Sequence, residues 1–566
     1  MRTFGFTVIL GKSYNCNNIS ADSIITYDDI RCFKHMIDKF EKDKVFSNDN
    51  NYIVIVDGVI LNKNVLITRM GGNTWLDTII KLYIEKGELF FDEFRGSFCG
   101  LLYDKSSNKT IIFSDHIGTK YIYYSQLENV IIFSTIIDFI YGFLKLNNVK
   151  YNLSVESAYL LLTYGFMLEG RTLCDKVFKL KPGYYLLVQD GKISEKRYCL
   201  LNNEPDYSMS ENEAIELCDS EFRRVIISQF EKDKEYGYKH LVALSGGLDS
   251  RMTSWVAHEL GYAEQLNYTF SQSDYLDESV PKQIARDLKH EWIFKFLDNG
   301  LWLKDIENIT KITGGNVLYY GLAHNGSFLE NLNLEKYGII HSGQLGDVIF
   351  GTWYESPNPQ AQFHLGNGAY SCTYLDKISN ISIEKFDNQE ISKFYHRGFC
   401  GTNNGQLIDM IYSETCSPFM DWDLMNKVLH IPANYRYNHK LYKKWIITKY
   451  PKAADYIWET IKASIKEPMI NIANRRIPIR ILPGKIFDLL KNKIGKQPTN
   501  KHMNPIGYYF ASNKDLEVFI NNILCQYGLI NDIELANVIR KIVISGTPIE
   551  KIQASSLMCA IKMYFS

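Results

Sequence analysis

Residues 241–251 read LVALSGGLDSR. The apolar run at 241–244 predicts a buried strand, and the Ser-Gly-Gly that follows predicts a tight turn. A helix is predicted over about residues 252–260. In such a strand–turn–helix unit the glycines let several backbone N–H groups converge on an anion, and the helix adds its positive N-terminal end. We therefore predict a phosphate-binding loop made of Ser245, Gly246, Gly247, Leu248, Asp249 and Ser250.

The acidic residue of this loop needs an explanation, because a carboxylate alone repels phosphate. Asp249 makes chemical sense as a ligand of Mg²⁺ that also contacts the phosphates. Ser245 and Ser250 add hydroxyl donors. No Lys follows the glycines, so the loop differs from the GxxxxGK[ST] type. The alternative interpretation is a plain strand-to-helix turn in which Asp249 is only a cap.

Around this loop the pattern of residues predicts strands that alternate with helices. Such alternation is typical of an α/β domain with a doubly wound parallel sheet. The predicted helices are 211–232 and 278–288, and the further predicted strands are 265–270, 293–296 and 338–343.

The N-terminal part of the chain is rich in short β-branched and aromatic runs bounded by turn residues. The runs at 52–56, 98–103, 110–113 and 130–133 predict strands, and 75–86 has helical spacing. We expect an α+β domain of packed sheets. Beyond about residue 480 the pattern is mostly helical. The predicted domains are 1–205, 206–475 and a helical C-terminal extension, 476–566.

The composition of the 566 residues excludes several classes of protein. The net charge of −1 favours neither nucleic acid nor an anionic membrane as partner. The 11 Cys are scattered without zinc-like spacing, which suits reduced thiols. No apolar run approaches the roughly 18 residues of a membrane span, and residues 1–15 read as a strand rather than a signal peptide. We expect a cytoplasmic protein, and the sequence leaves a homodimer open.

The loop resembles the pyrophosphate-binding loop of the N-type ATP pyrophosphatases (PP-loop, adenine nucleotide alpha hydrolase-like), above all the asparagine synthetase family. SGQLGD (342–347) resembles that family's Ser-Gly-Glu-Gly-Ser-Asp. The resemblance implies ATP as substrate, with Asp347 as a second Mg²⁺ ligand facing Asp249. It also implies a nucleotide site bordered by Leu244, Phe270, Ser342 and Gly343.

Three later segments extend the resemblance. SETCSPFMD (413–421) resembles Glu-Ala-Arg-Val-Pro-Phe-Leu-Asp, and Lys444-Trp445-Ile446 resembles the start of a Lys-Tyr-Leu-Leu-Arg helix. Lys462 lies near the family's late catalytic Lys. The resemblance implies that Lys462 stabilises the transition state, that Lys444 contacts phosphates and that Glu414 orients a Lys or meets the amine. Both lysines could equally be solvated helix residues, and Glu414 could cap a turn or pair a cation.

The first domain resembles the family's glutaminase, an Ntn-hydrolase fold, through VDGVILN (56–62), FRGSF (94–98) and SDHIGTKYIYY (114–124). It departs from that pattern at its predicted active site. The chain begins Met-Arg-Thr instead of presenting an N-terminal Cys, and Asp57 replaces the oxyanion-hole Asn, where a carboxylate repels an oxyanion. Asn73 or Thr74 stands where the family binds substrate with Asp. We expect no glutaminase activity; Thr3 as a processed nucleophile is the alternative.

Gln344 stands where asparagine synthetase has Glu, and an amide cannot act as a base near neutral pH. The substrates therefore need not be those of asparagine biosynthesis. The first hypothesis is an ATP-dependent, AMP-forming ligase that joins a carboxylate to ammonia or an amine, including a peptide amine. The second is a ring-closing relative, like lasso-peptide macrolactam or β-lactam synthetases. The third is a non-catalytic binding protein that keeps the fold.

Overall fold

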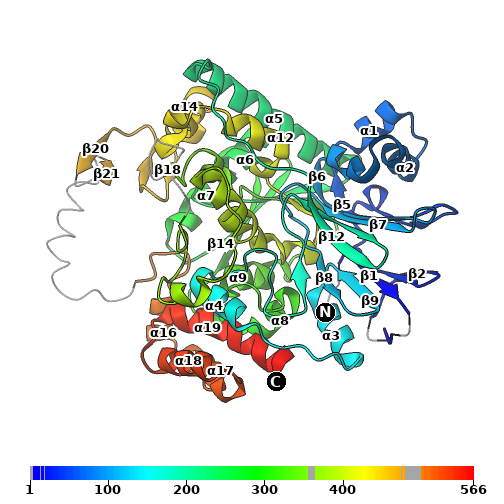
Figure 1. The fold of residues 1–566 in the computed structure, drawn as a ribbon. Coiled ribbons are helices and arrows are strands. Elements are labelled where there is room, and N and C mark those ends of the chain that lie inside the picture. The colour runs from blue at the N-terminus through cyan, green and yellow to red at the C-terminus, as the bar shows by residue number, and fades with distance from the viewer. Residues whose placement is uncertain (1–3, 13, 18, 355–363, 473–474, 479–498) are drawn as a thin grey trace.

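The computed structural model describes residues 4–12, 14–17, 19–354, 364–472, 475–478 and 499–566. Two antiparallel sheets built from the N-terminal part lie on one side of the molecule, and a parallel sheet forms its centre (Figure 1). The C-terminal helices pack along one edge of both parts.

Two six-stranded sheets form a sandwich whose strands alternate between core-facing and outward-facing residues. Phe6, Val8 and Cys32 of one sheet share a buried cluster with Ile55, Leu101 and other residues of the second. In spatial order the first sheet is β10 (Phe178–Lys179), β8 (Tyr123–Gln126), β9 (Val130–Ser134), β1 (Phe6–Gly11), β3 (Ile30–Lys34) and β2 (Ser23–Tyr27). The second is β12 (Lys192–Arg197), β11 (Tyr184–Gln189), β7 (Lys109–Ser114), β6 (Gly96–Asp104), β5 (Tyr52–Ile60) and β4 (Val45–Asn48).

Helices cover both outer faces of this sandwich and complete four αββα layers. Helices α1 (Lys63–Met70) and α2 (Trp75–Lys86) bury Leu66 and Ile79 against the second sheet. Helices α3 (Ile137–Leu146) and α4 (Val155–Tyr164) share a core with the first sheet. The predicted strands and the predicted helix 75–86 of this region are confirmed.

The predicted doubly wound parallel sheet is also present. Its five strands lie in the order β15 (Glu291–Phe296), β14 (Gln265–Ser271), β13 (Lys239–Ala243), β16 (Tyr337–His341) and β17 (Thr415–Cys416), all parallel. Helices α5 (Glu211–Glu235), α6 (Asp249–Glu259) and α7 (Leu276–Leu288) pack on the face that carries Val242, whereas α9 (Tyr320–Leu329) covers Leu241 and Ile340 opposite.

The order of these strands reverses at one place. After β13 the chain adds β14 and β15 on one side, then crosses to place β16 on the other. Such a switch point separates two loops at the carboxyl ends of the strands, and open α/β sheets bind ligands there. The loops that follow β13 and β16 are the two that the sequence singled out.

The C-terminal helices do not form a separate core. Helices α16 (Ile506–Ser512), α17 (Lys514–Leu524), α18 (Ile533–Ser545) and α19 (Pro548–Ala560) share one apolar cluster with α3, α4 and α8 (Ile306–Thr313). Tyr564 stacks on Tyr141 of α3 at 4.2 Å, and its hydroxyl donates to Asp138 at 2.7 Å. The extension thus connects the sandwich to the helices of the central part.

Shorter elements fill the region between β16 and the C-terminal helices. They are α10 (Gly346–Ile349), α11 (Gln389–Lys393), α12 (Trp422–Leu429), α13 (Ala433–Arg436), α14 (Lys440–Lys449), β18 (Ile457–Trp458), β19 (Ala463–Ser464), β20 (Met469–Ile472) and β21 (Arg475–Pro478). Among the described residues, no helix combines the length and the apolarity needed to cross a membrane.

Candidate active site

The loop after β13 is compact and held by its own serines. The Ser245 N–H donates to Ser250 Oγ at 2.9 Å, and the two Oγ atoms lie 3.0 Å apart. The Gly247 N–H donates to Ser245 Oγ at 3.2 Å. Gly246 donates its N–H to Asp277 of α7 at 2.8 Å. These bonds fold the loop into a compact turn at the start of α6. Its binding of an anion stays a prediction.

The turn after β16 packs directly against the start of α6. A Cβ on Gly343 would lie 2.3 Å from the Ser250 nitrogen, and one on Gly346 would lie 2.5 Å from Asp249 Cγ. Only glycine allows approaches this close. Thr253 of α6 also donates its hydroxyl to the Ser342 carbonyl at 3.2 Å. The glycines of SGQLGD are therefore required by contact between the two motifs.

This contact brings the two predicted metal ligands together. The Asp347 backbone N–H donates to the Asp249 carboxylate, and the Tyr442 hydroxyl donates to it at 2.7 Å. Burial and the charge of Asp347 together raise the pKa of Asp249 to about 8. The carboxylates of Asp249 and Asp347 together offer the oxygen donors that Mg²⁺ prefers. The donor set therefore fits the predicted metal.

Neighbouring side chains orient the second carboxylate. Thr352 Oγ1 donates to Asp347 Oδ2 at 2.7 Å and lies 2.5 Å from His439 Nε2. His439 Nε2 lies 4.0 Å from the same Asp347 oxygen. His439 and Tyr442 come from the start of α14, which the sequence did not connect with the metal ligands.

The hairpin that carries Lys462 contacts the loop, whereas Lys444 pairs with a residue of α5. Lys462 lies at the exposed tip of the β18–β19 hairpin with φ +58°, and the Glu459 N–H of the same hairpin donates to the Gly246 carbonyl at 3.2 Å. Lys444 instead pairs with Glu211 of α5, and its side chain is 54% exposed. The predicted contact of Lys444 with phosphate is therefore corrected. The α14 residue that reaches Asp249 is Tyr442.

Glu414 lies among lysines, and its predicted contact with the amine substrate stays a prediction. It is fully buried and pairs with Lys44 at 2.9 Å and Lys120 at 2.8 Å, both from the first domain. This position corresponds to the alternative of pairing a cation. Gln344 stays beside the site. Its backbone carbonyl accepts from the Ser417 hydroxyl at 2.8 Å, and its side-chain amide donates to the Thr402 backbone carbonyl.

The residues predicted to border the nucleotide differ in exposure. Leu244 is 2% exposed and belongs to the core under the loop. Phe270 is half-buried at the carboxyl end of β14, with its ring 4.5 Å from His324. Phe270 therefore remains available as a wall for a ligand, whereas Leu244 supports the loop from below.

A buried hydrogen-bonded triad fixes the strand that carries the second turn. Asp233 Oδ2 lies 2.8 Å from both His240 Nδ1 and His341 Nε2, and Asp233 Oδ1 accepts from the Ile339 N–H at 2.7 Å. Three N–H groups thus satisfy one carboxylate. The triad anchors the end of α5 to β13 and β16 just below the site.

In the first domain, the predicted oxyanion position is occupied by an ion cluster. Asp57 is 1% exposed and lies 2.8 Å from Lys120 and 3.7 Å from Lys44. Burial opposes ionisation, but the two lysines outweigh it and hold the pKa of Asp57 below its usual value. Because the same lysines pair with Glu414, the interdomain ion cluster (Asp57, Lys120, Lys44 and Glu414) joins the two parts of the molecule.

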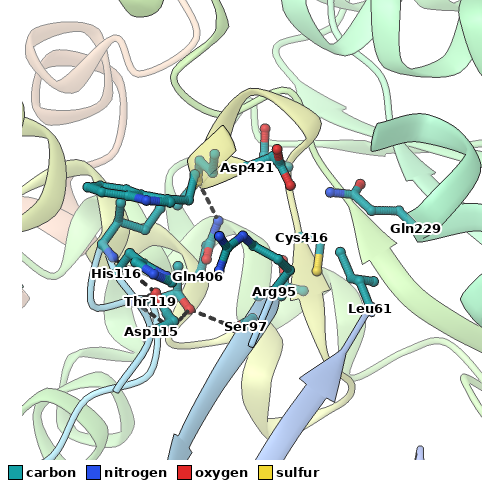
Figure 2. A pocket seen from close by; sticks show the side chains of 16 residues that line it. Leu61, Arg95, Ser97, Asp115, His116, Thr119, Gln229, Gln406, Cys416 and Asp421 are labelled. Carbon is teal, nitrogen blue, oxygen red and sulfur yellow. Dashed lines mark hydrogen bonds between the residues drawn. The ribbon is translucent and has the colours of Figure 1, made fainter. Parts of the chain in front are cut away.

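A small cavity lies beside this cluster, between the first domain and the segment that precedes α12 (Figure 2). Its volume of about 30 Å³ admits one or two water-sized molecules and no larger substrate. The polar side chains that line it and are labelled in Figure 2 are Arg95, Ser97, Asp115, His116, Gln229, Gln406 and Asp421, among others.

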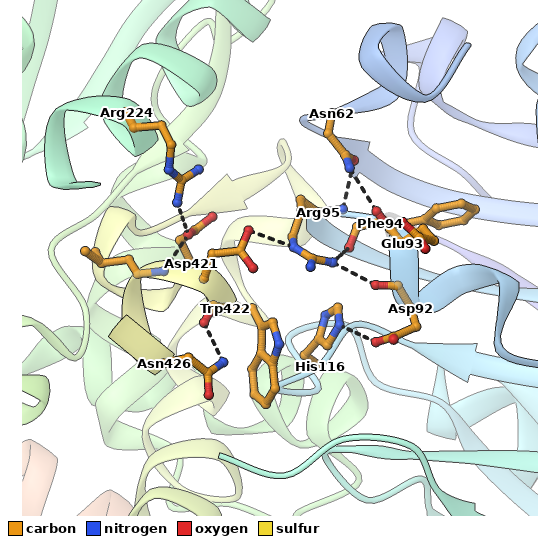
Figure 3. A network of polar contacts seen from close by, with 12 residues as sticks. Asn62, Asp92, Glu93, Phe94, Arg95, His116, Arg224, Asp421, Trp422 and Asn426 are labelled. Carbon is orange, nitrogen blue, oxygen red and sulfur yellow. Dashed lines mark hydrogen bonds and ion pairs between the residues drawn. The ribbon is translucent and has the colours of Figure 1, made fainter. Parts of the chain in front are cut away.

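Polar contacts hold α12 against the first domain next to the cavity (Figure 3). Arg95 Nε donates to Asp423 Oδ2 at 2.9 Å, and the His116 ring stacks on Trp422 at 4.8 Å. On its other side, Asp421 accepts from Arg224 of α5 at 2.7 Å. These contacts fix the first domain against the central part of the molecule.

Comparison with known proteins identifies the first domain. Residues 36–199 match the family model described as a glutamine amidotransferase domain. The chain is 31% identical over 94 residues to asparagine synthetase (glutamine-hydrolysing) 2 of Bacillus subtilis, which covers 16% of this chain and 13% of that protein. The resemblance to the asparagine synthetase family is thereby confirmed, and the N-terminal part contains a glutamine amidotransferase domain over residues 36–199.

Other similarities are weaker. The chain is 25% identical over 193 residues to amidase chry2 of Gibberella zeae, covering 33% of this chain and 27% of that protein. Both curated relatives are thus matched over less than a third of their length. A glutamine phosphoribosylpyrophosphate amidotransferase from B. subtilis is similar at 9% identity and TM-score 0.24, over 52% of this chain and 85% of that one. The allosteric regulatory enzyme of purine biosynthesis is similar at 8% identity and TM-score 0.24, over 52% of this chain and 75% of that one.

Proposed function

We propose that this chain is an ATP-dependent, AMP-forming amide ligase of the asparagine synthetase type, with a PP-loop domain as its synthetase part. The observation that carries the proposal is the contact between the two motifs at the switch point of the parallel sheet. There Asp249 and Asp347 share a hydrogen bond beside the Ser245–Ser250 loop. A simple turn with a capping Asp would not require a second carboxylate against the first.

In the proposed reaction, a substrate carboxylate attacks the α-phosphate of ATP and pyrophosphate leaves. An amine or ammonia then attacks the acyl-adenylate, and AMP leaves as the amide forms. Ser245, Ser250 and the loop N–H groups would bind the pyrophosphate portion, and Lys462 would offset charge on the reacting phosphate. Asp249 and Asp347 would hold Mg²⁺, whose charge offsets that of the phosphates.

The amidotransferase domain supports ammonia or an amine as the nitrogen source. We propose that the domain itself does not hydrolyse glutamine. Asp57 stands at the oxyanion position, and its carboxylate is already compensated by Lys120 and Lys44. Such a pair leaves no neutral donor for an oxyanion at this residue.

Exchange of labelled pyrophosphate into ATP, measured over a panel of carboxylates, tests the ligase. We expect exchange with the correct carboxylate, and a loss of about 10²–10³-fold in Asp249→Asn, since a metal ligand is removed. The matched control is Asp376→Asn, a carboxylate 71% exposed on the surface, which should retain full exchange. Binding of ATP without exchange for any carboxylate would instead favour a binding protein.

An assay of amide product formation distinguishes the acceptors. Product formation with ammonia but none with glutamine would support an inactive first domain, and glutamine turnover would contradict it. A linear peptide that carries both groups tests the ring-closing alternative. Gln344 makes this alternative worth testing, because its amide already donates to the Thr402 carbonyl and provides no base for a free ammonium ion.

A further inference from the structure

Arg251 follows the phosphate loop directly and is fully buried. Its guanidinium donates to four backbone carbonyls. Nη1 reaches Ala453 at 3.1 Å and Tyr456 at 3.2 Å, whereas Nη2 reaches Gly246 at 3.2 Å and Ile457 at 2.7 Å. One side chain thus connects a carbonyl of the loop with three carbonyls of a segment about 200 residues later.

That segment leads into the β18–β19 hairpin. Ile457 begins β18, the strand pairs with β19, and Lys462 lies in the turn between them. The Gly246 carbonyl that accepts from Arg251 also accepts from the hairpin's Glu459 N–H at 3.2 Å. Loop, arginine and hairpin therefore meet at a single carbonyl oxygen.

The contact is tight on the loop side as well. A Cβ on Gly246 would lie 3.1 Å from Glu459 Cβ and 3.0 Å from Asp277 Oδ1. The Tyr275 hydroxyl donates to the Glu459 carboxylate. The hairpin is consequently seated against the loop, and a shift of its base would change where its tip lies.

We propose that Arg251 is a positioning residue that sets the β18–β19 hairpin, and with it Lys462, against the phosphate-binding loop. The proposal rests on the role of Lys462 in the proposed function. A planar guanidinium can serve four carbonyls in fixed directions, whereas the compact ammonium of Lys cannot. Arg251 is fully buried, so a cation that is costly to bury is kept at this junction.

The first test measures the hairpin without any reaction. In Arg251→Met and Arg251→Lys, we expect faster amide hydrogen exchange at residues 457–464 than in the wild type, with Arg251→Lys intermediate. The control is Leu557→Ala, a fully buried residue of α19, which lowers the melting temperature without changing exchange in the hairpin. Unchanged exchange at 457–464 in both Arg251 variants overturns the proposal.

The second test is a double-mutant cycle on pyrophosphate exchange. We expect Arg251→Met to lower kcat about tenfold to a hundredfold with little change in the KM for ATP, because misplacement of a catalytic group acts on the chemical step. The combination of Arg251→Met with Lys462→Ala should be no slower than Lys462→Ala alone. Strictly additive losses overturn the coupling to Lys462.

The two tests separate this proposal from the function on which it rests. Lys462→Ala could retain full pyrophosphate exchange while the Arg251 variants speed hydrogen exchange in the hairpin. In that case the catalytic role of Lys462 is wrong, and the positioning of the hairpin by Arg251 stands. Lys462→Ala could instead lose pyrophosphate exchange while hydrogen exchange in the hairpin is unchanged in the Arg251 variants. In that case the proposed ligase stands, and the positioning role of Arg251 is wrong.

Discussion

At the scale of single residues, buried carboxylates in and near the site have different partners and different acidities. Asp249 has a neighbouring carboxylate and a raised pKa, whereas Asp57 has two lysines and a lowered pKa. Asp409, 5% exposed, has only the Asn325 amide as a side-chain partner in the described chain, and its burial raises the pKa to about 7. Each environment gives the same side chain a different charge near neutral pH.

Asp409 gives a prediction for stability against pH. Its pKa is about 4 in an unfolded chain and about 7 in the folded protein. Between these values only the folded state keeps the proton, so its contribution to stability falls as pH rises from about 4 to about 7 and is level above. Asp409→Asn removes this loss and keeps an oxygen for Asn325. We expect the melting temperature of the variant, relative to the wild type, to rise between pH 5 and pH 8; parallel curves would contradict the assignment.

At the scale of elements, the site is built from two turns that meet, and both were visible in the sequence. The apolar strand before Ser-Gly-Gly and the helical periodicity after it define β13 and α6 locally. The family resemblance predicted the pairing of Asp249 with Asp347, and the parallel strands bring it about because they end at one edge of the sheet. The packed sheets of the first domain were likewise predicted from short alternating runs.

Two kinds of information about the site were not in the sequence pattern. One is which side of a helix faces the site, and the other is which residues far apart in the sequence make contact. Tyr442 and Lys444 are two residues apart, which is about 200° around a helix, so only one can face Asp249. Spacing alone does not say which. Glu414 meets Lys44 and Lys120 only after segments 370 and 294 residues apart in the sequence have packed together, and no local pattern encodes that contact. Arg251 adjoins the predicted loop, but its four carbonyl partners also lie far along the chain.

The meeting of the two turns predicts the effect of adding one methyl group. A Cβ at Gly346 would press on Asp249 Cγ, so Gly346→Ala should cost about 1–3 kcal/mol of stability and reduce pyrophosphate exchange. Gly321 is the control, since it lies exposed in α9 with no atom within 4 Å of a new Cβ. Gly321→Ala should be neutral or stabilising by up to about 1 kcal/mol. Equal effects in the two variants, measured by urea unfolding, would show that the approach to Asp249 is unimportant.

At the scale of the whole molecule, the two main parts are joined by buried charge as well as by apolar packing. The interdomain ion cluster lies where Asp57 of β5 meets the residue before β17. Beside it, Arg95 and His116 hold the start of α12. The first domain is therefore an integral support of the central sheet, whatever its own chemistry.

Removing one member of the cluster should reveal this support. Lys120→Met leaves Asp57 and Glu414 buried with Lys44 alone, and we expect a loss of about 3–5 kcal/mol in the free energy of unfolding. Combining it with Asp57→Asn should recover part of that loss, because one uncompensated charge disappears. Lys81→Met, which breaks an exposed pair with Asp77, should cost less than about 1 kcal/mol. Urea denaturation measures all three, and an unrecovered double variant would argue against charge compensation.

The shared core of α3, α4 and α19 has a consequence for biosynthesis. The apolar faces of α3 and α4 emerge from the ribosome several hundred residues before α19, which covers them. During that interval the nascent chain exposes these apolar faces to solvent. Their burial by α19 then closes a loop several hundred residues long. We therefore expect the early sandwich to be prone to aggregation until the last helices dock.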